Sequence, residues 1–136
     1  MSSIREQILA QVITNLKAIT GVTASKVVRT RIKPVEESDY PYISLEPVSD
    51  SPEANDLGFI KWDLAVKIVL YEKGTVPDSV ADALLTKIKD KMLADRTIST
   101  LAADVFPGPI SWNFQLGNKD CVEIESIYLI KYIEVG

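Results

Sequence analysis

The stretch from Phe59 to Tyr71 constrains the fold more than any other part of the chain. Large apolar residues alternate there with smaller or charged ones, at Ile60, Trp62, Leu64, Val66, Ile68 and Leu70. This period of two is typical of a β-strand with one buried face and one wet face. At about 3.3 Å per residue the run reaches roughly 40 Å, which is long for a strand. We therefore predict a long strand that organises a sheet and points Lys61, Asp63 and Lys67 outward.

The residues before this strand predict a helix and two shorter strands. Ser3 and Glu6 form a capping box, and apolar residues recur at helical spacing up to Ile19, with Gly21 as the stop signal. The β-branched run from Lys26 to Lys33 predicts a strand that Pro34 ends. Residues 40–47 predict a second short strand, bracketed by Pro41 and Pro47. Residues 48–58 are rich in breakers, so we expect a long exposed loop there.

The residues after the long strand predict a second helix and a C-terminal hairpin. Thr75 is the expected cap of this helix, with Pro77 and Asp78 in its first turn. Residues 95–102 are a connector with one helical turn, and 110–115 and 121–135 are strands. Near Ser126 both parities of the last strand become apolar, which indicates either a bulge or a strand covered on both faces.

The element order is therefore α-β-β-β-α-β-β. This order predicts an α+β fold with a mainly antiparallel sheet of about five strands and two helices packed on one face. The chain has 136 residues, the size of one ordinary domain, so we expect residues 1–136 to form a single domain. Its N-terminus lacks the basic-then-apolar order of a secretory signal and its apolar runs are short, so we expect a cytosolic protein.

The residue inventory argues against most catalytic chemistry. The chain has no histidine, which removes the commonest general base and the commonest metal ligand. Cys121 is its single cysteine, so neither an intramolecular disulfide nor a cysteine-based zinc cage is expected. No glycine pattern suits a phosphate, and the formal net charge of −4 argues weakly against a broad nucleic-acid surface. We expect no enzyme, no cofactor and no metal site.

Three groups of residues remain as candidates for contact with a partner. The acidic residues Asp50, Glu53 and Asp56 lack the glycine and spacing of a calcium loop, so a solvated loop is the better interpretation. Arg29 and Arg31 lie on one face of the first strand, where they suit either an acidic partner or a solvated face that discourages edge pairing. Large aromatic residues on strands usually mean core, and any that point outward become interface anchors: Trp62, Trp112 and Phe114.

The whole chain resembles the tail terminator proteins of long-tailed bacteriophages, of the minor tail protein U type. The resemblance follows the order and spacing of five features, namely the N-terminal helix, the Tyr40-Pro41 entry to a strand, the loop, the strand from Trp62 to Leu70, and the helix opening at Val76. It continues through the Leu101 connector into the final strand with Ile127 to Tyr132.

This resemblance implies a six-fold ring on the head-proximal end of the tail tube, which stops tube growth and offers a surface to the head-side connector. The implied partners are further copies of the chain, the tube protein and head–tail connector proteins, with DNA passing through the lumen without specific binding and no membrane. It implies a location in the virion tail after assembly in the host cytoplasm. By position, the contacts are expected in the segment from Asp50 to Phe59 and at Lys61, Asp63 and Lys67. Alternatives are another ring protein of the phage neck or tail tube, and a small cytosolic ligand-binding module.

Overall fold

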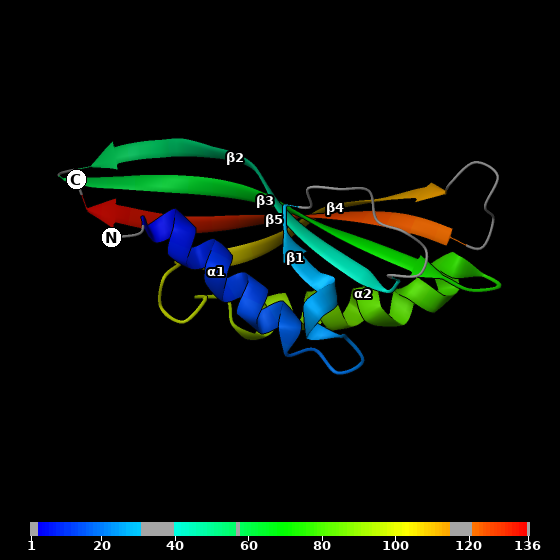
Figure 1. Ribbon diagram of the computed structural model, residues 1–136. Helices are drawn as coiled ribbons and strands as arrows, with labels where there is room; N and C mark the ends of the chain where they lie inside the picture. The colour runs from blue at the N-terminus through cyan, green and yellow to red at the C-terminus, as the bar shows by residue number, and fades with distance from the viewer. Residues whose placement is uncertain (1–2, 31–39, 57, 115–120, 136) are drawn as a thin grey trace.

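The computed structural model describes residues 3–30, 40–56, 58–114 and 121–135 (Figure 1). Five strands form one sheet in the order β1-β2-β3-β5-β4. Their bounds are β1 Val27–Arg29, β2 Tyr42–Asp56, β3 Phe59–Lys73, β4 Asp104–Phe114 and β5 Cys121–Val135. β1 runs parallel to β2, and the other three pairings are antiparallel. The helices α1, Ile4–Lys17, and α2, Pro77–Ala94, lie on the same side of this sheet (Figure 1). The predicted α+β class and element order are confirmed.

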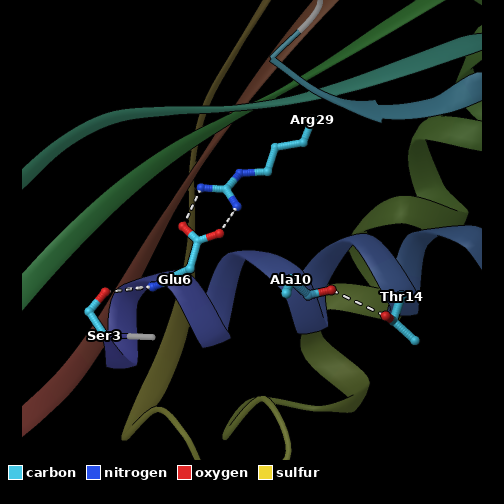
Figure 2. Close-up of polar contacts among 5 residues, drawn as sticks. All are labelled: Ser3, Glu6, Ala10, Thr14 and Arg29. Carbon is cyan, nitrogen blue, oxygen red and sulfur yellow. Dashed lines mark hydrogen bonds and ion pairs between the residues drawn. The ribbon is translucent and has the colours of Figure 1, made fainter. Parts of the chain in front are cut away.

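The N-terminal helix begins where the sequence predicted. The Ser3 hydroxyl accepts a hydrogen bond from the Glu6 backbone N–H at 3.1 Å, which satisfies one of the open donors of the first turn (Figure 2). The helix ends at Lys17, before Gly21, which has a positive φ of 91°. Between this helix and β1 lies a short 3-10 helix, Ala24–Lys26.

The cap of α2 differs from the prediction. Val76, not Thr75, occupies the N-cap position, and its side chain makes no capping hydrogen bond. Pro77 follows at the first helical position, where its missing N–H costs no intrahelical bond. α2 therefore begins without a polar cap. The fixed φ of Pro77 favours the start of the helix instead.

The predicted loop at 48–58 is wrong, because β2 continues through it as far as Asp56. Among the described residues, β1 pairs with β2 only from Ile43 to Leu45, so no described strand pairs with the outer edge of the rest of β2, and proline there removes no hydrogen bond between described strands. Register shifts between Pro47 and Ser49 and between Pro52 and Ala54 absorb the breaker residues. The β2–β3 pairing extends to Asp56 and Phe59, and Gly58, just before β3, has a φ of 89°.

The core lies between the helices and the inward face of β3 and β5. The predicted inward residues Leu64, Val66, Ile68 and Leu70 are all at most 1% exposed, while Ile60 and Trp62 are partly buried. Further core residues come from both helices: Ile8, Leu9, Val12, Leu16, Leu85, Ile88 and Met92. β5 keeps an unbroken register with β3, and the bulge lies in β4, between Pro107 and Ile110. On the outward face Val69 and Tyr71 are also buried, which the alternation did not predict.

Tyr128 makes the core sensitive to alkaline pH. Burial, with a smaller contribution from the charge of Asp90, raises the pKa of the Tyr128 hydroxyl to about 12. A raised pKa means that the folded state favours the protonated phenol, so this stabilisation is complete below pH 10 and is lost as pH rises toward 12. We expect the free energy of unfolding to fall by about 2–3 kcal/mol over this range through this group. Urea unfolding at pH 8 and at pH 11 measures about half of this loss, because pH 11 lies midway between the two pKa values, and Tyr128→Phe should make the loss smaller. An identical loss in the variant would contradict this assignment.

Candidate assembly surface

The two ends of the sheet differ in the strands that form them. At the proximal end, defined by Lys73, Phe114 and Cys121, β3, β5 and β4 lie side by side. At the distal end, defined by Phe59 and Val135, β2, β3 and β5 continue without β4 (Figure 1, beside the C label). The β4–β5 pairing stops at the Asp104–Lys131 pair. The last residues of β5 therefore have no β4 neighbour along their outer edge.

Charged side chains cross the helix-free face of the distal half in one ladder. Lys131 on β5 donates hydrogen bonds to Asp63 on β3 at 2.9 Å and to Glu53 on β2 at 3.2 Å. These two carboxylates raise the pKa of Lys131, and the contribution of Asp63 is larger than that of Glu53. Lys67 pairs with Glu125 at 3.5 Å. Three predicted contact residues, Glu53, Asp63 and Lys67, are thus engaged within the chain, while Lys61 is exposed on the same face.

Asp50 lies on the opposite, helix-covered face, and its side chain is only 9% exposed. Its Oδ2 accepts hydrogen bonds from the Tyr132 hydroxyl and from Arg5 on α1, the latter at 3.1 Å. Burial, and then the hydrogen bond to Asp50, raise the pKa of Tyr132 well above its usual range. The Tyr132 ring stacks on Trp62 with 6.4 Å between centroids and 12° between planes. Asp50, which was expected to lie in an exposed loop, is therefore a structural link between α1, β2 and β5.

A hollow of about 370 Å³ opens beside this cluster, at the edge where β4 ends. We define it by the residues that line it: Lys61, Trp62, Ala103, Lys131, Tyr132 and Ile133, with Glu53 at its rim. Ala103 belongs to the connector after α2, and its backbone N–H donates to the Lys131 carbonyl at 2.7 Å. The Trp62 Nε1–H is buried and has no hydrogen-bond acceptor among the described residues. Trp62 and Tyr132 alternate in direction with Lys61, Lys131 and Ile133 along an unbroken register, so these two groups of side chains lie on opposite faces of the sheet.

β4 carries a row of exposed large apolar residues near the proximal end. Ile110, Trp112 and Phe114 are 42%, 49% and 51% exposed, and we call these three residues the β4 strip. They alternate on one edge strand and pair with Ser126, Ile124 and Val122 of the core-facing parity of β5. The expected core role of Trp112 and Phe114 is therefore wrong, and both meet the stated condition for interface anchors.

The remaining predicted residues are less directly tied to this surface. Arg29 on β1 donates hydrogen bonds from its two terminal guanidinium nitrogens to the two carboxylate oxygens of Glu6 on α1, the one from Nη2 at 2.8 Å, and lowers the pKa of that carboxyl (Figure 2). Phe59 is 46% exposed at the distal end, paired with Val135. Asp56 pairs with Phe59 through the backbone, and its side chain lies outside the described residues, as does Arg31 with the whole of the predicted 31–33 strand end.

Several residues of this surface carry no signal in the sequence. Tyr132 looks like any apolar-face residue of a strand, and Ala103 has no chemical group of its own. Neither shows that β4 stops short of the end of β5. In the described part of the chain, no three His, Cys, Asp or Glu side chains gather closely enough to hold a metal ion. No helix of the same residues is long and apolar enough to cross a membrane.

Comparison with known proteins gives a match in structure alone. Neither a family model nor a curated protein sequence matches the chain. Among solved structures, the chain is similar to a component of the virion of a native gene transfer agent particle, with a TM-score of 0.61 and 12% sequence identity. The match covers 98% of this chain and 100% of the other. At this identity the comparison establishes a shared fold over the full length of both chains.

Proposed function

We propose that this chain is a structural protein of a phage-type virion and, more specifically, a tail terminator. In this role several copies, six by the resemblance, form a ring on the head-proximal end of the tail tube. The ring stops tube polymerisation and offers its other face to the head-side connector. The role is one of assembly rather than catalysis, in a virion tail put together in the host cytoplasm.

The observation that carries the proposal is the end-to-end match with a chain of a gene transfer agent virion. Because it covers both chains almost entirely, the shared unit is the whole domain and not a common helix–strand fragment. The sequence resemblance to tail terminators rests independently on the order and spacing of elements, and that order is the one in the structure. The two lines of support agree on a virion component, and the resemblance adds the place in the tail.

The proposed mechanism is steric. One face of the ring resembles the end surface of the tube and therefore binds the tube. The opposite face of the same ring lacks the surface that would accept another ring of tube protein, so tube growth stops. Of the predicted contact residues, Lys61 and Phe59 suit this contact best, because both are exposed near the distal end. Asp63 and Lys67 are held in ion pairs within the sheet, so they are better suited to shaping the ring lumen around DNA that passes without specific binding.

The proposal is tested by measuring mass and tube binding with the purified full chain. Native mass spectrometry and particle imaging should give closed rings, expected to be six-fold, and the rings should bind the ends of uncapped tail tubes. Tail tubes whose ends are already capped serve as the control, because the binding site for a terminator is occupied on them. Binding to capped tubes but not to uncapped ones would favour another ring protein of the neck and contradict the terminator role.

A further inference from the structure

We propose that residues 97–103, which we call the strap, are a strained segment that can leave its turn and lengthen β4 along the free edge of β5. The strap joins α2 to β4. The inference does not depend on the terminator role, because it concerns how one copy of the chain changes shape. It follows from an outlier in the backbone and from the sheet edge that lies beside it.

The strap holds three successive residues in the left-handed region of the backbone. Ile98, Ser99 and Thr100 have φ values of 47°, 52° and 71°. Residues other than glycine rarely adopt this conformation, and then singly, because the Cβ atom crowds the following carbonyl oxygen. Ile98 and Thr100 are also β-branched, which makes the outlier more marked. Strain of this kind persists only where the surrounding structure imposes it, and it gathers at switch segments.

Two contacts hold the strap in this turn. The Asp95 carboxylate accepts a hydrogen bond from the Ser99 backbone N–H at 3.1 Å and another from the Asn15 side chain on α1 at 3.3 Å. The Ile98 side chain is 1% exposed and belongs to the core. One polar contact and one apolar contact therefore impose the strained conformation.

The free edge of β5 lies directly beyond the strap. The Ala103 N–H donates to the Lys131 carbonyl, so the backbone groups of Lys131 point toward the β4 side. In an antiparallel strand the groups of alternate residues point to the same side, so those of Ile133 point there too, where no described strand pairs with them. A second hollow, of about 210 Å³, is lined by residues 100–103 and by Ile133. The edge has open backbone groups and space beside them.

The strap is long enough to reach this edge while its ends stay in place. Arg96 Nε donates to Asp104 Oδ1 at 2.6 Å, which joins the residues that flank the strap. Three extended residues reach roughly 10 Å at about 3.3 Å each, and Ile133 is two positions beyond Lys131. Extension relieves the left-handed residues and adds backbone pairing, but it removes Ile98 from the core. When the strap is extended, the edge is covered and no longer invites pairing with another chain.

Opposite substitutions at Ser99 test the inference. Ser99→Pro forbids the left-handed turn, because proline fixes φ at about −65°, and it should release the strap. Ser99→Gly removes the strain at this residue and should hold the turn more firmly. Ser99 is exposed, so neither change touches the core directly. Thr30→Gly is the matched control, because Thr30 is a left-handed residue outside the strap, with a φ of 48°.

Backbone hydrogen exchange, read by mass spectrometry with residue-level fragmentation, follows both ends of the change. The Ile133 amide should exchange fast in the wild type, and Ser99→Pro should slow it by about tenfold or more. Ser99→Gly should leave Ile133 fast and slow the Leu101 and Ala102 amides, which donate to carbonyls inside the turn, by about fivefold. Thr30→Gly should match the wild type in both segments. Slow exchange in β3 shows that a variant is folded.

Unchanged fast exchange at Ile133 in folded Ser99→Pro overturns the inference, as does an Ile133 amide that is already protected in the wild type. Faster exchange of Leu101 in Ser99→Gly contradicts the strain in the turn and overturns it as well. If Ser99→Pro loses the protection of β3, Asp95→Ala decides, because it removes the polar contact without adding a proline. This variant should also slow exchange at Ile133, and unchanged exchange there overturns the inference.

Discussion

Replacing Leu70 with alanine is expected to lower the free energy of unfolding by about 3–4 kcal/mol. Leu70 is 0% exposed in the central strand β3, and its neighbours across the sheet are Ile43 and Ile124, which are equally buried. Truncation there loses the transfer free energy of the removed methyl groups and leaves a cavity that strands on both sides prevent from closing. The change in denaturant midpoint at constant m-value measures this loss.

Lys67→Ala is the matched control on the same strand. Lys67 lies on the opposite face and makes a partly exposed ion pair with Glu125, so its removal should cost less than about 1 kcal/mol. The difference between the Leu70→Ala and Lys67→Ala losses measures the stabilisation that comes from burying the inward-facing side chains of β3. Equal losses in the two variants would contradict the placement of the helix layer over the inward face.

Replacing Asp50 with alanine is expected to cost about 2–4 kcal/mol, although the residue sits in a stretch that reads as an exposed loop. The change removes the acceptor of two hydrogen bonds and leaves the buried Tyr132 hydroxyl, 3% exposed as a residue, without its partner. Hydrogen bonds to a charged group are worth more than neutral ones, and an orphaned buried donor carries its own desolvation cost. Chemical unfolding of the two proteins measures the difference.

Two further variants make this prediction specific. Tyr132→Phe removes the hydroxyl, so in the Asp50→Ala background it should cost much less than it does alone, with a coupling energy of about 1–2 kcal/mol. Asp63→Ala is the control, because Asp63 is also an acid on the sheet in an ion pair but lies on the helix-free face. Its loss should stay below about 1 kcal/mol. Additive effects of the Asp50 and Tyr132 changes would contradict the direct bond between them.

Those parts of the fold that depend on local pattern could be predicted from the sequence. Alternation alone identifies β3, and the Ser3 cap marks the start of α1, because both signals lie within a few neighbouring residues. The continuation of β2 to Asp56 could not be predicted in this way. Its breakers are tolerated because no described strand pairs with the outer edge of this half of β2, and the position of a strand at an edge is a property of the assembled sheet.

The candidate site was harder to predict for the same reason. Asp50 meets Tyr132 across 82 positions of sequence, and no local signal links them. Trp112 and Phe114 show the same alternation as core residues, since the pattern records a shared face but not whether a helix covers it. Lys61 was predicted to point outward and is exposed, and Phe59, predicted only as a contact by its position, is exposed too, while the role of both in contacts remains a prediction.

The measurement that tests the terminator role most directly is the length of tail tubes grown in the presence of this protein. Tube protein polymerising in excess, with and without saturating amounts of the chain, is followed by electron microscopy. We expect tubes to stop growing soon after addition and to carry a ring of this protein at one end. Tubes that continue to lengthen at saturating protein would contradict the account.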